Sequence, residues 1–235
     1  MTPIHHLWQR SCLTLLLAAL TLPAFAQQPT APERAAMLKA TLAASQVILR
    51  QYEWIETTVV SLKGDEKSRK QQRCYYGADG GVQKIEISKS PESKKKRGLR
   101  GRIVASKQEE MTDYMKSAVS LVKTYVPPDP AKIQAAKDAG RVSIDILQPG
   151  KRARLNFRDY VKPGDNFGVE VDLVSNRPLG LKVSTYLDSA KDPVTLDVRM
   201  GQLNDGTSYA STVTLDAKAK KIKVTMQNSG YRKTN

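Results

Sequence analysis

Alternation of apolar and polar residues is the main pattern of the chain after Arg141. In 152–158, for example, Ala153, Leu155 and Phe157 alternate with arginines and an asparagine. A two-residue period places the apolar side chains on one face of a β-strand. The same pattern recurs in the runs 142–146, 152–158, 169–173, 179–187, 194–200, 213–215 and 222–226. Pro, Gly, Asn and Asp separate these runs, which indicates short turns between antiparallel strands.

Three earlier runs, 54–62, 69–76 and 82–88, are also typical of strands, with a turn at Gly77-Ala78-Asp79-Gly80. The chain is therefore expected to form about ten strands. A sheet of that size must curl or close on itself. Its apolar face needs a cover, since one face of an antiparallel sheet is normally buried.

A helical period appears in three other segments. Segment 32–52 is rich in Ala and carries one apolar stripe. Ser106-Lys107-Gln108-Glu109 has the form of a capping box and predicts the start of a second helix, which Pro127-Pro128 ends. Asp129-Pro130 predicts a third helix, which ends at Gly140. The expected fold class is α+β: a strongly curved antiparallel sheet or incomplete β-barrel of about ten strands, with three helices packed on the concave face.

The first 26 residues have the pattern of a secretory signal peptide. Arg10 precedes an apolar run, 13–22, and Ala24-Phe25-Ala26 offers a small-x-small cleavage site. The alternative is an uncleaved anchor helix, but the run is short of the roughly 20 apolar residues that span a bilayer. We expect export to the periplasm or beyond, with residues 27–235 forming a single domain.

Cleavage would leave few residues suited to catalysis. Both histidines, His5 and His6, lie in the expected signal peptide, and Cys74 is the only cysteine after it. The chain would then lack the commonest general base and the preferred ligands of zinc and copper. We expect no enzyme, no catalytic residue, no metal and no cofactor, with a hydrolase using carboxylates alone as a remote alternative. Cys74 is expected to be a strand residue, the alternative being a thiol that reacts or pairs with a partner.

The charge of the chain favours anionic partners. It has 38 Lys and Arg against 23 Asp and Glu, a net charge of +15. An exported basic protein meets phospholipid headgroups and lipopolysaccharide, whereas nucleic acid is a poor candidate. Segment 88–102 is expected to be a mobile basic loop that binds an anionic membrane surface. The alternative is a solvated linker. Its candidate binding residues are Lys94, Lys95, Lys96, Arg97, Arg100 and Arg102.

Three local stretches look like an uncharacterised family of exported bacterial proteins. They are Gln51-Tyr52-Glu53-Trp54, Arg97-Gly98-Leu99-Arg100-Gly101-Arg102 and Tyr160-Val161-Lys162-Pro163-Gly164-Asp165. The order of elements, a helix, three strands, a helical insertion and an antiparallel meander, resembles the LolA, LolB and LppX type of periplasmic lipoprotein carrier. The lipidated cysteine of the LolB type has no counterpart here.

The resemblance implies a hydrophobic cavity that shields acyl chains from water. Methionine and aromatic side chains would suit such a ligand, but the same residues could form an ordinary core. The expected function is a non-catalytic periplasmic carrier or chaperone-like protein for lipid or acylated lipoprotein. The alternative is an envelope protein–protein interaction module with a filled core. The candidate cavity residues are Trp54, Met111, Tyr114, Met115, Leu121, Tyr125, Leu155 and Phe157.

Overall fold

The computed structural model describes residues 31–90 and 99–234, which form three α-helices, one short 3-10 helix and ten β-strands. The helices are α1 (Ala31–Leu49), α2 (Leu99–Val122), α3 (Pro130–Asp138) and the 3-10 helix η1 (Lys218–Lys220). The strands are β1 (Tyr52–Leu62), β2 (Asp65–Tyr76), β3 (Val82–Lys89), β4 (Val142–Gln148), β5 (Arg152–Arg158), β6 (Asn166–Asp172), β7 (Arg177–Tyr186), β8 (Pro193–Gln202), β9 (Ser208–Ala217) and β10 (Ile222–Lys233).

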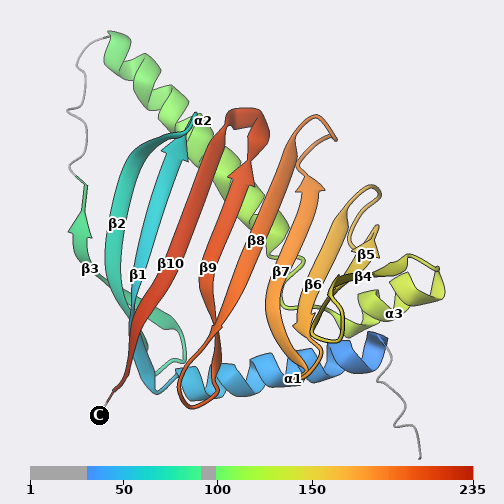
Figure 1. Cartoon of the computed structure of the whole chain (residues 1–235). Helices are drawn as coiled ribbons and strands as arrows, with labels where there is room; N and C mark the ends of the chain where they lie inside the picture. The colour runs from blue at the N-terminus through green and yellow to red at the C-terminus, as the bar shows by residue number, and fades with distance from the viewer. Residues whose placement is uncertain (1–30, 91–98, 235) are drawn as a thin grey trace, which may run out of the picture.

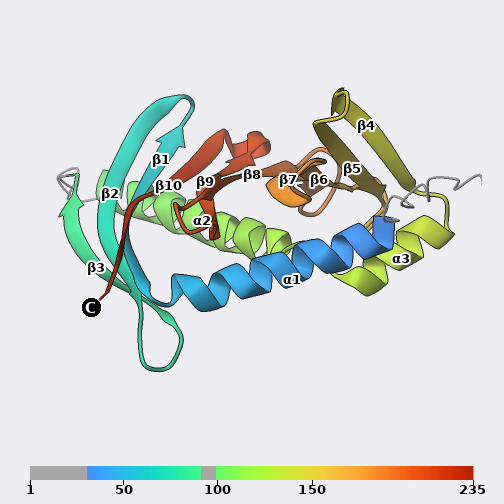
Figure 2. The same cartoon turned by 60° about the horizontal axis from the view of Figure 1, so that its bottom comes forward.

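All ten strands form one antiparallel sheet in the order β3-β2-β1-β10-β9-β8-β7-β6-β5-β4. β1 and β10 are neighbours, so the first and last strands pair inside the sheet, while β3 and β4 are its open edges. The sheet is curved and the three helices lie on one side of it (Figures 1 and 2). The expected α+β fold with helices on the concave face is confirmed, and the sheet does not close into a barrel.

The hydrophobic core lies between the inner face of β5–β9 and the helices. Tyr125, Phe157, Phe167 and Val183 are each at most 1% exposed. The expected alternation of β5 is also present, since Ala153, Leu155 and Phe157 are buried and the residues between them are not. This is the main buried hydrophobic cluster among the described residues.

Polar contacts fix the C-terminal end of α1, which crosses one end of the strands (Figure 1). The Ser208 amide donates to Ser45 Oγ over 3.1 Å, and the Tyr52 hydroxyl donates to Asp205 Oδ2 over 2.6 Å. Hydrogen bonds from Thr207 and then Tyr52 lower the pKa of Asp205 to about 2. The Asp205 carboxylate is therefore charged at neutral pH. The hydrogen bond from Tyr52 to Asp205 should not change with pH near neutrality.

The start of α2 differs from the sequence prediction. The helix begins at Leu99, so Ser106 lies inside it and the capping-box prediction is wrong. For the same reason, the last four residues of the predicted basic loop 88–102 are helical, and Ser88 and Lys89 belong to β3. Arg, Leu and Ala are good helix formers. The many basic residues of this segment instead suggested a loop, so the start of the helix was not predicted. The helix also ends at Val122, before Tyr125.

The β1–β2 connection is a two-residue turn made by Lys63 and Gly64. Both residues have positive φ, 56° and 94°. Tight hairpin turns with two positive φ angles match the twist of antiparallel strands, and they normally carry Asn or Asp followed by Gly. Lys63 therefore occupies a position that its residue type rarely adopts.

Candidate functional site

Three of the expected cavity residues belong to the filled core. Tyr125, Leu155 and Phe157 are 0%, 4% and 1% exposed. The rings of Phe157 and Phe167 stack at 6.0 Å, and the Tyr160 ring lies 4.8 Å from that of Phe167. These three residues therefore belong to the buried core, and a ligand cavity beside them stays a prediction.

A buried carboxylate organises the turn between β5 and β6. Asp165 is 2% exposed and accepts the amides of Tyr160, Val161 and Lys162 at 2.6, 3.0 and 2.8 Å. It also accepts the Tyr125 hydroxyl at 2.5 Å. Burial and this hydrogen bond raise the pKa of Tyr125. The stretch 160–165, noted above for its family resemblance, therefore has a structural role, because Asp165 holds both the turn and the segment after α2.

The apolar stripe of α2 supplies four more of the expected residues. Met115 and Leu121 pack against the core, whereas Met111 and Tyr114 are partly buried outside it. The Tyr114 hydroxyl donates to Asp192 Oδ1 in the β7–β8 connection. Burial and this hydrogen bond raise the pKa of Tyr114, which stays a neutral donor.

A second polar contact holds the same part of α2. Lys220 Nζ in η1 forms an ion pair with Glu110 at 2.8 Å and lies 5.8 Å from the centre of the Tyr114 ring. The backbone of α2 approaches the sheet most closely at β9. The C-terminal half of the helix is thus held by apolar packing and its middle by polar contacts.

Apolar residues on the inner face of β1 and β10 continue past the core. Val224 packs against the core, and Val60 lies opposite it in the β1–β10 pair. Met226 is two residues further along and shares this face, because side chains alternate along a strand. Val60 and Met226 are partly buried but lie outside the core cluster. The alternation in the sequence predicts an apolar face for Val60 and Met226. Only the order of the strands shows that this face extends past the core.

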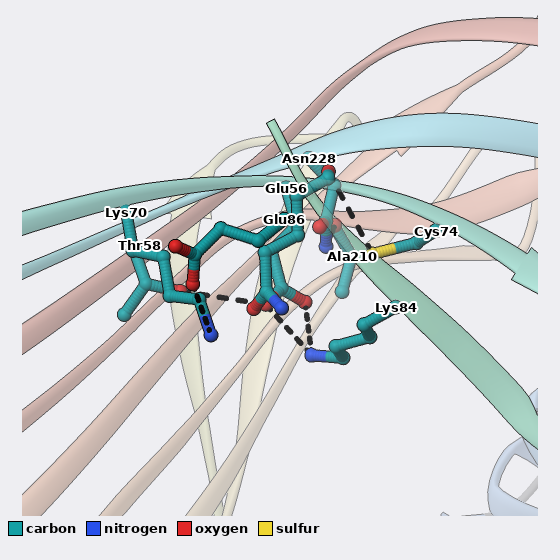
Figure 3. A network of polar contacts seen from close by, with 9 residues as sticks. Glu56, Thr58, Lys70, Cys74, Lys84, Glu86, Ala210 and Asn228 are labelled. Carbon is teal, nitrogen blue, oxygen red and sulfur yellow. Dashed lines mark hydrogen bonds and ion pairs between the residues drawn. The ribbon is translucent and has the colours of Figure 1, made fainter. Parts of the chain in front are cut away.

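A network of charged side chains lies at the β3 end of the same face (Figure 3). Lys84 Nζ lies 2.7 Å from both carboxylate oxygens of Glu56, which is 5% exposed, and Lys70 pairs with Glu86 at 3.2 Å. Glu56 lies opposite Asn228 across the β1–β10 pair and so shares the face of Met226. This network bounds the apolar surface and was not predicted from the sequence.

Cys74 lies next to this network and is fully buried in β2. Burial, and then the negative charge of Glu56, raise the pKa of its thiol. A buried thiol of this kind is mostly protonated at neutral pH and is a poor nucleophile. The expectation of a strand cysteine is confirmed.

Trp54 does not join the other expected cavity residues. Its ring stacks on Tyr231 at 5.6 Å and lies 5.7 Å from Tyr76, and Tyr209 contacts Tyr231 at 4.4 Å. Trp54 is 8% exposed, and its Nε1 has no hydrogen-bond partner among the described residues. A shift in the β1–β10 register between Glu53 and Ile55 accompanies this aromatic cluster. These contacts place Trp54 in an aromatic cluster of β1, β2, β9 and β10, and its grouping with the α2 residues stays a prediction.

Most of the basic residues singled out from the sequence lie outside the described residues. These are Lys94, Lys95, Lys96 and Arg97, while Arg100 and Arg102 lie in the first turn of α2. Arg102 is exposed. Their binding to an anionic surface stays a prediction.

The outer face of the sheet carries a shallow hollow of about 630 Å³ over β5–β8, and Gly168 and Gly180 are among its lining residues. Glu170 lies in it and forms ion pairs with Arg152 and Arg154. A charged hollow suits no acyl chain. Within 31–90 and 99–234, no three His, Cys, Asp or Glu side chains gather in a way that would hold a metal ion. The helices of the same residues include none that is long and apolar enough to cross a membrane.

Comparison with known proteins finds likeness in structure alone. No protein-family model matches the chain. No curated protein matches it either.

Solved structures that it resembles include three bacterial proteins. A LolA superfamily protein from Nitrosomonas europaea has 10% identity and a TM-score of 0.34, over 84% of this chain and 94% of the other. A DUF1329 family protein from Desulfovibrio piger has 10% identity and a TM-score of 0.32, over 83% and 92%. A putative outer membrane lipoprotein-sorting protein domain from Vibrio parahaemolyticus has 14% identity and a TM-score of 0.35, over 87% and 92%. The LolA family, expected from the sequence, is thus among the structures that the chain resembles.

Proposed function

We propose that the chain is a non-catalytic carrier or chaperone-like protein of the bacterial periplasm that binds an acyl chain of a lipid or of an acylated lipoprotein. One observation carries this proposal: the apolar stripe of α2 and the apolar inner face of β1 and β10 both extend past the filled core. Met111 lies on the first of these surfaces, and Val60 and Met226 lie on the second. We call these three residues the acyl surface.

The chemistry of the acyl surface suits a flexible hydrocarbon ligand. Two of its three residues are methionines, whose unbranched side chains adapt to ligands of varied shape. The ion-paired Glu56 and Lys84 lie beside it and offer polar partners to the head of an amphipathic molecule. The expected signal peptide would deliver the protein to the compartment where such molecules cross between membranes.

A second candidate function, an envelope protein–protein interaction module, is favoured by the solid packing of the core. Tyr125, Phe157 and Phe167 are buried in one hydrophobic cluster between β5–β9 and the helices. In this alternative, the partly exposed apolar residues would contact a protein partner instead of a lipid. Cys74 gives no support to nucleophilic catalysis, because it is buried and its burial raises the pKa of the thiol.

Titration with a fluorescent fatty acid tests the proposal. We expect saturable binding of one probe per chain, because the proposal assigns the three residues to one site, and displacement of the probe by phospholipid. Bovine serum albumin and a heat-denatured sample serve as positive and negative controls. Fluorescence that rises no further than in the denatured sample would contradict the proposal and favour the interaction module.

A further inference from the structure

Two neighbouring turns at one end of the sheet bring several lysines together. Figure 1 shows the β1–β2 and β9–β10 connections at the same end. The Lys63 amide donates to the Lys221 carbonyl over 2.8 Å, which ties the turns to each other. The second turn contains η1 and also carries Lys218 and Lys220. All four lysines are exposed.

Ion pairs around these turns leave three lysines uncompensated. Four carboxylates in the two turns, the strands that flank them and α2 have a basic partner. The pairs are Asp65 with Lys67, Glu66 with Arg69, Glu110 with Lys220, and Asp216 with Lys223. In the adjoining β7–β8 connection, Asp192 accepts the Tyr114 hydroxyl, and Asp188 lines the same hollow as Lys218 without an ion pair to it. Among the described residues, Lys63, Lys218 and Lys221 have no ion-pair partner; we call them the lysine tip.

The backbone at the lysine tip makes the presence of lysine there unusual. Lys63 and Lys221 have φ angles of 56° and 54°, in the left-handed region. The other two described non-glycine residues with positive φ are Asp159 and Asn176, which are types that tolerate this region. Glycine would relieve the strain at both lysine positions. Residues in sparsely populated backbone regions cluster at functional sites.

We propose that the lysine tip is the surface by which this protein docks on an anionic phospholipid bilayer. The proposal rests on the proposed function, since a lipid carrier has to approach a membrane, and it adds where the contact is made. The tip is formed by protruding turns, which fit a flat surface. Lysine ammonium groups act as point charges and suit diffuse lipid charge, and the tip lacks the aromatic and arginine side chains that nucleic acid sites use.

Vesicle co-sedimentation at low salt tests the lysine tip. The protein, purified as the cell processes it, is mixed with phosphatidylglycerol-containing or pure phosphatidylcholine vesicles, without any acyl cargo. We expect binding only to the first. For K63G/K221G we expect binding on the order of thirtyfold weaker, as each lysine near an anionic surface is worth about fivefold. Its unfolding temperature should equal or exceed that of the original protein, because glycine accepts both φ angles.

Matched variants separate the tip from overall charge. K151Q/K182Q removes two exposed lysines from elsewhere on the sheet and should bind like the original protein. K63Q/K221Q removes the charges without a glycine and should weaken binding as much as K63G/K221G. The proposal fails if K63G/K221G and K151Q/K182Q weaken vesicle binding equally, or if neither weakens it. It also fails if the original protein does not bind anionic vesicles. Fatty-acid binding is measured separately, so loss of docking leaves the carrier function testable by itself.

Discussion

Replacing Asp165 with alanine is expected to lower the free energy of unfolding by about 3–5 kcal/mol. The Asp165 carboxylate is buried and accepts hydrogen bonds from three backbone amides and from Tyr125. Alanine would leave these donors without partners, and each buried donor left unsatisfied costs about 1–3 kcal/mol. The Tyr125 side chain sits in the core, so the damage would reach the packing of α2.

Urea denaturation followed by circular dichroism measures this effect. Asp188→Ala, at an exposed position in the β7–β8 connection, is the control and should change stability by less than about 0.5 kcal/mol. Tyr125→Phe removes one of the four hydrogen bonds to Asp165 together with the contact between Tyr125 and Thr185, and should cost about 1–2 kcal/mol. A D165A protein as stable as the D188A protein would show that the turn does not depend on this carboxylate.

The double change Met111→Glu and Met226→Glu is expected to weaken fatty-acid binding by at least about tenfold. Both side chains are partly exposed, so the carboxylates can reach water in the empty protein. A bound acyl chain would cover them, and burying an unpaired charge against hydrocarbon is unfavourable. The effect should therefore fall on binding and not on folding.

Probe titration of the double variant, with far-ultraviolet circular dichroism to check its fold, measures this prediction. Met37→Glu is the matched control, because Met37 is 44% exposed on α1 and lies outside the acyl surface. M37E should bind the probe like the original protein. Unchanged binding by a folded M111E/M226E protein would place the acyl chain elsewhere.

Local patterns predicted the fold well because each strand carries its own signal. The alternation of Ala153, Leu155 and Phe157 with polar residues can be read from a seven-residue stretch. In the structure these three residues are the buried residues of β5. One buried face and short turns then leave an antiparallel sheet as the simplest arrangement. The start of α2 was missed because basic residues are common in both loops and helices, and only Ser106 offered a capping signal.

The candidate site was less predictable because it depends on contacts between distant strands. Glu56 and Lys84 meet across β2, and neither has a local pattern that indicates the other. The stacking of Trp54 on Tyr231 was not predicted, because it depends on the pairing of β1 with β10 and the register shift between them. The place of Met226 on the proposed acyl surface likewise depends on the pairing of the first and last strands. No short stretch of sequence predicts that pairing.

Native mass spectrometry of protein purified without detergent, combined with lipid extraction, tests the central claim most directly. The account predicts a discrete added mass that extracts as a phospholipid or an acyl chain and returns when lipid is added to stripped protein. A clean mass of the chain alone that takes up no added lipid would contradict it. The apolar residues beyond the core would then belong to an interface with another protein.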